Sequence, residues 1–291
     1  MNASAFLRDF KAKIDWNAQE LALATYRRSR LFRALYPRRF RLYHVGIAKA
    51  GTHSIAAIFA KHHLSAHEPE AYRTIDLVVR QYEGQPSAAV DAELLLRDER
   101  LYLEVEASHI ISELVPNLVR LFPDAKFLLT LRDPVSWLES VIQQVERTKN
   151  LRNVKDWERL RVCRWGNLAA LPEEAAFRAA GVVSIAGSLA RFRNHHECVL
   201  KAVPSDRLLI LPMQEIGARL GEIADFAGVP RSSVRPEAAH SYKRITNVSL
   251  LDCVPAEYID GLVQRECGDL VRRFFPTAKT MAERRAALTK T

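Results

Sequence analysis

Residues 41–63 read RLYHVGIAKAGTHSIAAIFAKHH, and this stretch decides the fold. Arg41–Ile47 has the apolar content of a short strand, and Ser54–His63 has the composition and length of a helix. The residues between them, Ala48–Thr52, are predicted to form the turn that joins the two. A strand, a tight turn and a helix in this order predict the first βα unit of a parallel sheet.

The turn carries residue types that suit an anion. Gly46 and Gly51 have the spacing of the glycines in a Walker A phosphate loop, but the lysine lies inside the loop, at Lys49. A glycine at position 51 lets the backbone approach an anion closely, and the first amides of the following helix form a ready anion site. Other candidate anion ligands in this loop are Ala50, Thr52, His53 and Ser54.

Two interpretations of this loop compete. The lysine-serine/threonine pair that would hold Mg²⁺ in a nucleotide triphosphatase is absent, so metal-dependent nucleotide chemistry is disfavoured. Lys49 instead supplies a mobile positive charge of the kind that group transfer needs. The alternative is an ordinary βα turn with an exposed lysine.

Outward from this unit, strands and helices continue to alternate. Further strands are predicted at 101–105, 126–131 and 207–211. Helices are predicted at 4–36, 72–100 with a break near 84–86, 112–122, 135–147, 187–202, 216–228, 255–274 and 278–290. This alternation predicts an α/β fold, a three-layer αβα arrangement around a central parallel sheet. We expect a basic helical extension over 1–40, the α/β domain over 41–250, and C-terminal helices over 251–291 packed on the same domain.

A second motif follows the strand at 126–131. Arg132 lies at the carboxyl end of this strand, and Asp133-Pro134 begins a helix. Ser140 lies eight residues after Arg132, about two turns into the helix. Because ligands of parallel sheets bind at the carboxyl ends of strands, this guanidinium and hydroxyl are placed to bind a phosphate. The alternative is an arginine that caps a strand and a surface serine.

The two motifs together resemble those of the sulfotransferases that use 3′-phosphoadenosine-5′-phosphosulfate (PAPS). The sequence AKAGTH at 48–53 is similar to the family's first signature, P-K-S-G-T-T, which grips the 5′-phosphosulfate end. Arg132 and Ser140 match the second signature, which binds the 3′-phosphate. Residues 103–134 also resemble the lead-in to that signature in the heparan N-sulfotransferase branch. The resemblance is good over 41–145 and weaker over 185–230.

The resemblance implies transfer of a sulfuryl group from PAPS to a hydroxyl or an amine, with 3′,5′-ADP as product and no metal required. It implies an in-line displacement in which Lys49 stabilises the leaving oxygen and a general base accepts a proton. Ala48 and His53 depart from the first signature without removing a backbone donor. Residues 104–107 lack the lysine of the family's Glu-Lys-Ser/Thr-Pro, so a lysine role there is not expected.

Several residues are candidates for the general base. Glu68 is favoured, because several branches of the family carry a catalytic glutamate in the loop after the first helix, which reads LSAHEPE at 64–70. His67 in the same loop and His109, similar in position to the catalytic histidine of small-molecule sulfotransferases, are the next candidates. Two further glutamates, Glu104 and Glu106, are weaker ones. The alternative for 67–69 is a surface helix cap.

Two late features of the chain resemble family elements. A basic loop in relatives helps to close over the 3′-phosphate, and here Lys243 and Arg244 are the candidates, against a solvated basic loop. Trp157 and Trp165 lie in a stretch where relatives build acceptor contacts, although packing in the core is the expected role of both.

Composition and charge bound the class of protein. Hydrophobic residues make up 48% and charged residues 26% of 291 residues, which is globular composition. The net charge is +9, of which residues 1–41 hold +7, so the body is not expected to bind nucleic acid. The basic arm is either a solvated helical face or a contact for a membrane surface, a carrier protein or another anionic partner.

Location and metal content are predicted from what the sequence lacks. There is no apolar run long enough for a membrane span and no apolar core of an export signal. The four cysteines have no C-x-x-C spacing and are interpreted as buried, reduced thiols, which favours the cytoplasm. His63 and His67 have the spacing of helical metal ligands, but no third ligand is apparent, so no metal site is predicted.

Two rival functions remain open at this level. A small-molecule kinase with an aberrant phosphate loop would need Mg²⁺ and an acidic ligand after a strand, for which Asp133 is the one candidate. A non-catalytic binding module is the other, although Lys49, Arg132 and Ser140 are all present. The acceptor can be a small molecule, a carbohydrate or a lipid.

Overall fold

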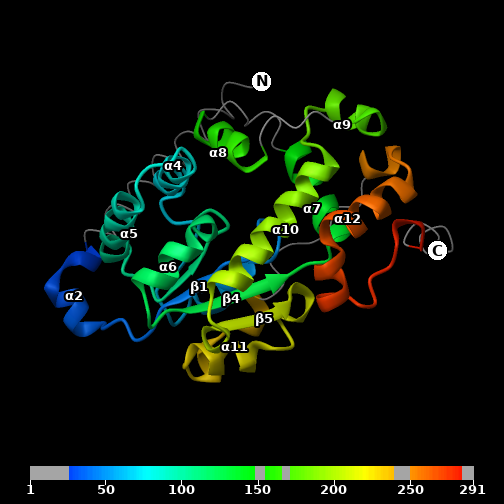
Figure 1. Ribbon diagram of the computed structural model, residues 1–291. Helices are drawn as coiled ribbons and strands as arrows, with labels where there is room; N and C mark the ends of the chain where they lie inside the picture. The colour runs from blue at the N-terminus through cyan, green and yellow to red at the C-terminus, as the bar shows by residue number, and fades with distance from the viewer. Residues whose placement is uncertain (1–25, 148–154, 166–170, 239–249, 284–291) are drawn as a thin grey trace, which may run out of the picture.

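A computed structural model describes residues 26–147, 155–165, 171–238 and 250–283 (Figure 1). Within them, one five-stranded sheet has the order β2-β3-β1-β4-β5, and every neighbouring pair is parallel. The strands are β1 Leu42–His44, β2 Ser65–His67, β3 Val105–Ala107, β4 Lys126–Leu131 and β5 Leu208–Pro212. The predicted α/β class with a central parallel sheet is confirmed.

The main helices lie before, between and after these strands. They are α2 Arg30–Leu35, α3 Thr52–Phe59, α4 Ala71–Tyr82, α5 Ser87–Leu101, α6 Val115–Leu121, α7 Pro134–Arg147, α8 Lys155–Trp165, α9 Ala175–Ala179, α10 Ile185–Ala202, α11 Leu220–Ala227 and α12 Ala256–Phe274. Helices α3 and α11 cover one face of the sheet, while α4, α5, α6 and α10 cover the other. Figure 1 shows α6 and α10 on one side of the strands and α11 on the other.

The alternation of side chains along β4 explains the two covered faces. Phe127 and Leu129 pack in the core beneath α4, α5, α6 and α10, whereas Leu128 packs in the core beneath α3 and α11. Because successive side chains of a strand point to opposite faces, a strand buried on both sides reads as a continuous apolar run. A third core joins α7, α10 and α12, which attaches the C-terminal helix to the sheet domain.

The strand predicted at 101–105 is wrong in position, since β3 begins at Val105. Leu101 instead ends α5, where it is buried on the same helix as Leu94. Tyr102 ends the helix with a φ of +50°. Residues 101–105, whose apolar alternation predicted a strand, therefore form the end of α5, a short connection and the first residue of β3.

Two other expectations differ from the structure. Strand β2 was not predicted, because this edge strand reads Ser-Ala-His and is only half-buried, which leaves no apolar run. The long helix predicted at 4–36 is interrupted at Ser29, which has extended backbone and caps α2 by accepting from the amide of Phe32 at 3.1 Å. The parts of the predicted terminal helices at 4–25 and 284–290 lie outside the described residues.

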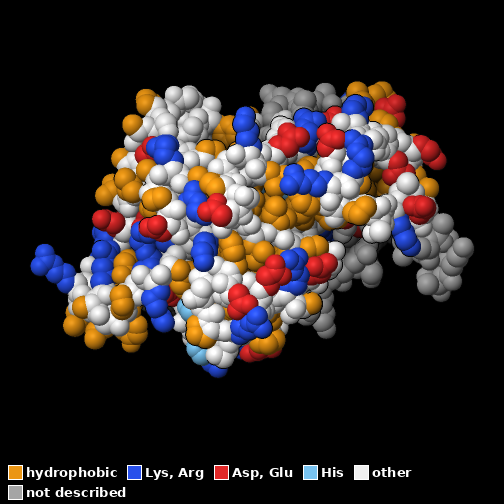
Figure 2. All heavy atoms as spheres, turned by 60° about the horizontal axis from the view of Figure 1, so that its bottom comes forward, with side chains coloured by type: hydrophobic (Ala, Val, Ile, Leu, Met, Phe, Trp, Pro, Cys, Tyr) orange, Lys and Arg blue, Asp and Glu red, His pale blue; other side chains and the backbone are white. Residues whose placement is uncertain are grey.

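The basic arm is partly neutralised by α5. Arg38 and Arg41 both donate to the carboxylate of Asp98, and Arg33 donates to the carbonyl of Glu99. Arg39, by contrast, is 72% exposed in its side chain. On the face shown in Figure 2, acidic and basic side chains are interspersed, as the small net charge of the body predicts.

The cysteines correct one expectation. All four are free, but only Cys267 is buried, Cys163 is half-buried, and Cys198 and Cys253 are exposed. The interpretation of four buried thiols is therefore wrong for the two exposed ones. Among the helices of the described residues, none combines the length and the apolar character needed to cross a membrane.

Candidate functional site

The loop at 46–54, which has the glycine spacing of a phosphate-binding loop, lies where the order of strands in the sheet reverses. From β1 the chain turns toward β2 on one side, whereas from its neighbour β4 it turns toward β5 on the other side. The crevice at such a switch point, outside the carboxyl ends of the strands, is the usual ligand site of open α/β sheets. The loop after β1 and Arg132 after β4 meet at this point.

The carbonyl groups of the loop are held by neighbouring elements. The three successive carbonyls of residues 48–50 accept hydrogen bonds from Trp137 Nε1 at 2.8 Å, from Arg132 Nη1 at 3.1 Å and, at close range, from Thr130 Oγ1. His195 of α10 bonds through Nε2 to the carbonyl of Val45 at 2.9 Å. These carbonyl oxygens already accept hydrogen bonds from the protein. The backbone groups of the loop that can bind an anion are therefore its amides.

The first turn of α3 supplies those amides. Gly51 is the N-cap of α3 with a φ of +95°, and Lys49 within the loop has a φ of +69°. The first helical bond runs from the amide of Ile55 to the carbonyl of Gly51 at 3.0 Å, so helix geometry leaves the amides of residues 52–54 without helical acceptors. Such donors, together with the helix dipole, are able to bind an anion.

A buried relay supports the loop from below. Thr130 Oγ1 donates to the carbonyl of Ala50 and therefore accepts from His44 Nε2, at 2.6 Å. Burial lowers the pKa of His44 to about 3, so this imidazole is neutral at physiological pH. Gly46 lies against the same pair, because a Cβ there would stand 2.8 Å from both His44 Cε1 and Thr130 Oγ1. The glycine is needed for this close approach.

One face of α7 lines the loop. Arg132 Nε donates to Ser136 Oγ at 3.1 Å, and Lys49 Nζ donates to Gln144 Oε1 at 3.4 Å. Ser136, Ser140 and Gln144 are each four residues apart and therefore share one face of the helix. Ser140 thus lies on the face between the contact to Arg132 and the contact to Lys49.

Asp133 has a structural partner at the start of α7. Its carboxylate accepts from the amide of Ser136 at 2.9 Å, in the manner of a helix N-cap. This carboxylate is the one on which the kinase alternative depends. No group of three or more His, Cys, Asp or Glu side chains that could hold a metal ion occurs among the described residues.

The three candidate bases lie together at the carboxyl ends of β2 and β3. His109 Nδ1 makes a short hydrogen bond to Glu68 Oε1, and His67 Nε2 lies 3.6 Å from the same oxygen. His67 Nε2 also bonds to Thr52 Oγ1 at 3.1 Å, and its ring stacks on His53 with centroids 3.5 Å apart. These contacts join the proposed proton acceptors to the first turn of α3.

Charge in this cluster is unevenly distributed. Burial raises the pKa of Glu68, but the attraction and hydrogen bond of His109 outweigh it and lower the pKa to about 2. Burial lowers the pKa of His67 to about 4, and it also lowers the pKa of His53. Glu68 is therefore ionised at neutral pH, and it lies among the imidazoles of His109, His67 and His53.

The weaker base candidates point elsewhere. Glu106 is buried in a bidentate ion pair with Arg97, and Glu104 is buried beside His63 Nδ1 at 3.3 Å. Both carboxylates are paired with other side chains and not with the imidazoles of His53, His67 and His109. Lys243 and Arg244 lie outside the described residues.

Sequence reasoning missed several residues that shape the site. Thr130, Trp137 and Gln144 contact the loop directly, and Gln144 could have been found from its spacing of four residues from Ser140. Trp157 packs against the core, as expected, and its ring also stacks on His109 with ring centroids 6.0 Å apart.

Comparison with known proteins gives one strong match. A family model described as a sulfotransferase domain matches residues 41–237. The crystal structure of a sulfotransferase from Alicyclobacillus acidocaldarius is similar at 16% sequence identity and a TM-score of 0.49, over 80% of this chain and 95% of that chain. No curated protein matches the sequence. The residues matched by the family model run from β1 to the turn after α11 and contain the loop, the α7 face and the imidazole cluster.

Proposed function

Because the chain belongs to the sulfotransferase family, we propose that it transfers a sulfuryl group from PAPS to a hydroxyl or amine of an acceptor. The observation that carries this proposal is the loop at 46–54. Its carbonyls accept hydrogen bonds from residues of β4 and α10, from Trp137 of α7 and from Arg132, while Lys49, Arg132 and the amides that begin α3 lie at the switch point. This donor set fits a polyanionic nucleotide.

We assign the two ends of the nucleotide to two parts of this donor set. The amides of residues 52–54 and Lys49 would hold the 5′-phosphosulfate, with the hydroxyls of Thr52 and Ser54 and the ring of His53 beside them. Arg132 and Ser140 would hold the 3′-phosphate, because α7 presents them beside the loop. Lys243 and Arg244 are proposed to add positive charge at this phosphate.

When bound, PAPS supplies the activated sulfuryl group. Lys49 contributes a positive charge at the loop, where negative charge develops on the leaving oxygen, and its position is set by Gln144 on α7. Positioning and electrostatic stabilisation dominate such transfers. The chain therefore needs no acidic metal ligand at this place.

The Glu68–His109 pair is proposed to accept the proton of the acceptor. Glu68, with a pKa of about 2, is a weak proton acceptor at neutral pH. It is well suited to hold an imidazole through Nδ1 and to stabilise the cation that forms, as a carboxylate does in other acid–base pairs. His67 is proposed to order this cluster through Thr52 rather than to accept the proton first.

The acceptor is proposed to be a small molecule, a carbohydrate or a lipid, met in the cytoplasm. Exposed arginines of the segment 26–41, such as Arg39, which is 72% exposed although it lies 3.9 Å from Glu104, would attract an anionic acceptor, carrier or membrane surface. Trp157, stacked on His109, is proposed as part of the acceptor surface.

The proposal is tested by titrating 3′,5′-ADP into the metal-free protein in a calorimeter. We expect binding that falls about 10- to 100-fold in Lys49→Ala and in Arg132→Ala, as loss of a hydrogen bond to a charged group predicts. The matched controls are Lys61→Ala, at the opposite end of α3, and Arg120→Ala on α6, and both should bind normally. PAPS with a panel of acceptors then tests transfer.

Two results would count against a sulfotransferase. Binding of ATP only in the presence of Mg²⁺, with none of 3′,5′-ADP, would favour the kinase alternative. Binding of 3′,5′-ADP that 5′-AMP reproduces fully would mean that the 3′-phosphate is not recognised.

A further inference from the structure

The loop that carries Glu68 has an unusual backbone. Glu68 and Glu70 have φ values of +49° and +50°, and Pro69 lies between them. Left-handed conformations of residues other than glycine cost on the order of 1–3 kcal/mol each and persist only where the surroundings hold them. Something outside the loop must therefore stabilise it.

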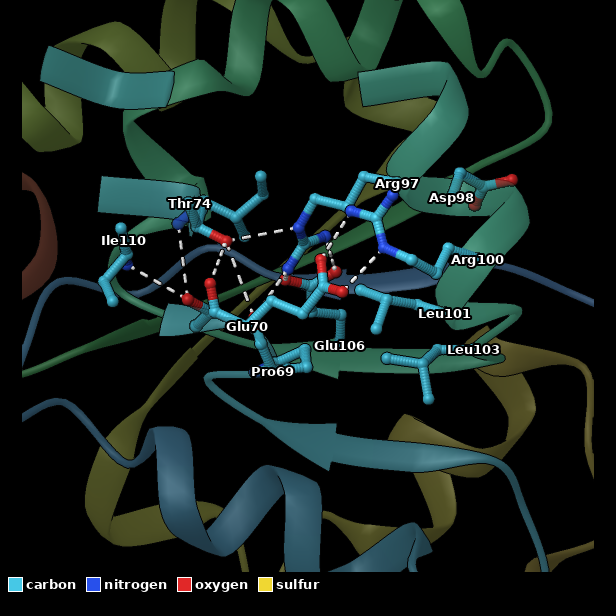
Figure 3. Close-up of polar contacts among 12 residues, drawn as sticks. Pro69, Glu70, Thr74, Arg97, Asp98, Arg100, Leu101, Leu103, Glu106 and Ile110 are labelled. Atoms are coloured by element: carbon cyan, nitrogen blue, oxygen red, sulfur yellow. Dashed lines mark hydrogen bonds and ion pairs between the residues drawn. The ribbon is translucent and has the colours of Figure 1, made fainter. Parts of the chain in front are cut away.

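Arg97 of α5 is the first of two such contacts. Its side chain is buried, and it forms a bidentate pair with Glu106 of β3 in which both N–O distances are 2.7 Å. The same guanidinium donates to the carbonyl of Pro69 at 3.0 Å and to Thr74 Oγ1 at 3.2 Å. Thr74 Oγ1 in turn donates to the carbonyl of Glu70 at 3.1 Å. Figure 3 shows this network around the loop.

Arg100, one helical turn further along α5, is the second contact. It forms a bidentate pair with the carboxylate of Glu70, with both N–O distances at 2.6 Å. In Figure 3 both arginines reach from α5 toward Pro69 and Glu70. On the other side, the amide of Glu68 donates to the carbonyl of Ala107 at 3.1 Å, which joins the loop to the end of β3.

We propose that Arg97 and Arg100 are positioning residues that hold the 68–70 loop in the conformation in which Glu68 meets His109. The inference rests on the role proposed above for the Glu68–His109 pair. Each arginine is matched by a carboxylate, Glu106 or Glu70, so the contacts act on the site through geometry more than through net charge. If the loop relaxed to an ordinary backbone conformation, the Glu68 side chain would leave His109.

The test is a ¹³C NMR titration of the glutamate side-chain carboxyl carbons. The Glu68 signal is assigned by its loss in Glu68→Gln. The variant is Arg100→Gln, because Arg100 is less buried than Arg97 and its loss is less damaging to folding. The matched control is Arg120→Gln, which breaks another arginine–carboxylate pair, between Arg120 of α6 and Asp91 of α5, away from the loop.

In the wild type, Glu68 faces His109, His67 and His53, and its carboxyl signal should stay ionised down to the lowest pH at which the protein is folded. In Arg100→Gln the Glu68 midpoint should move up toward the usual glutamate range, and in Arg100→Lys it should move less. Arg120→Gln should resemble the wild type. A Glu68 signal that is unchanged in both Arg100 variants, while the Glu70 signal shifts, would overturn the inference.

Kinetics with an acceptor found by the screen give a second readout. Arg100→Gln should lower kcat about 10- to 100-fold, the range expected when a catalytic group is displaced by about 1 Å, and leave the affinity for 3′,5′-ADP unchanged. Equal losses in 3′,5′-ADP binding and kcat would indicate general damage and contradict a positioning role. Because the NMR titration needs neither donor nor acceptor, it can succeed where the proposed function fails, and the reverse.

Discussion

At the scale of single residues, Thr130 shows how a buried hydroxyl can define a loop. It lies in the middle of the sheet, accepts from His44 and donates to Ala50. A hydroxyl can do both at once, whereas a valine of nearly the same shape can do neither. Thr130, whose buried neighbours on β4 are all apolar, therefore supports the loop and is not only a packing residue.

Thr130→Val should destabilise the protein by about 1–3 kcal/mol, because it leaves His44 and the Ala50 carbonyl without their buried partner. It should also weaken binding of 3′,5′-ADP, since the loop carbonyl is released. Urea unfolding and calorimetry measure the two effects. Thr130→Ser keeps the hydroxyl and should retain both properties; a variant pair that behaves alike would contradict the relay.

Glu68→Gln tests the charge of the imidazole cluster. In the folded protein the pKa of Glu68 is about 2, below the ordinary value of 4.5. The Glu68 carboxylate therefore stabilises the fold above pH 4.5, and this contribution is lost as pH falls toward 2. At pH 7 the variant should be less stable by at most on the order of 3 kcal/mol. The difference from wild type should shrink below pH 4.5 in urea unfolding experiments, whereas Glu257→Gln, at an exposed position, should change little at any pH.

At the scale of elements, α7 joins the two motifs that are far apart in the sequence. It begins at Pro134 after Asp133 caps it, and its face at Ser136, Ser140 and Gln144 passes from Arg132 to Lys49. Trp137 fixes the helix in place, because its side chain is only 1% exposed and donates to the carbonyl of Ala48 in the loop. One element, α7, therefore contacts both Arg132 and Lys49 and fixes where they lie relative to each other.

Ser140→Ala should weaken binding of 3′,5′-ADP about 5- to 30-fold, which corresponds to roughly 1–2 kcal/mol for a hydrogen bond to a phosphate. Binding of 5′-AMP, which lacks the 3′-phosphate, should not change. Calorimetry with both nucleotides makes the comparison within one variant. An equal loss for both nucleotides would place Ser140 at the other end of the ligand.

At the scale of the whole molecule, histidines whose pKa is lowered by burial lie on β1, β2 and α10. His44 lies on β1, His67 on β2, and His195 and His196 on α10, and His195 bonds to the carbonyl of Val45, 150 residues away in the sequence. Burial lowers the pKa of His196 to about 4 and lowers that of His195 well below the ordinary value. Between about pH 4 and pH 6.5 these histidines are therefore protonated in the unfolded chain but neutral in the folded protein.

The free energy of unfolding should fall as pH decreases from 6.5 toward 4. Below pH 6.5 the unfolded histidines bind protons while the buried ones do not, and each such histidine adds up to about 1.4 kcal/mol per pH unit to the slope. Urea unfolding at a series of pH values measures the slope. His196→Gln should flatten it, and His62→Gln, at an exposed site, should not; a stability independent of pH in this range would contradict the assignment.

Much of the architecture follows from the sequence because it is local. The strand at 126–131, the turn with Lys49 and Gly51, and the eight-residue step from Arg132 to Ser140 are each set by neighbouring residues, through periodicity, backbone freedom and helix geometry. Strand β3 was misplaced because the last turn of a helix and a short strand have the same apolar pattern over five residues.

Only the tertiary structure decided which groups meet. Glu68 and His109 are 41 residues apart and meet because parallel pairing of β2 with β3 aligns their carboxyl ends. Arg97, on α5, reaches the carbonyl of Pro69 across 28 residues. Sequence reasoning named Glu68, His67 and His109 as separate candidates and left Glu106 among them. Pairing of β2 with β3 brings Glu68, His67 and His109 into one cluster. Glu106 instead forms the ion pair with Arg97, and Arg97 also donates to the carbonyl of Pro69 in the 68–70 loop.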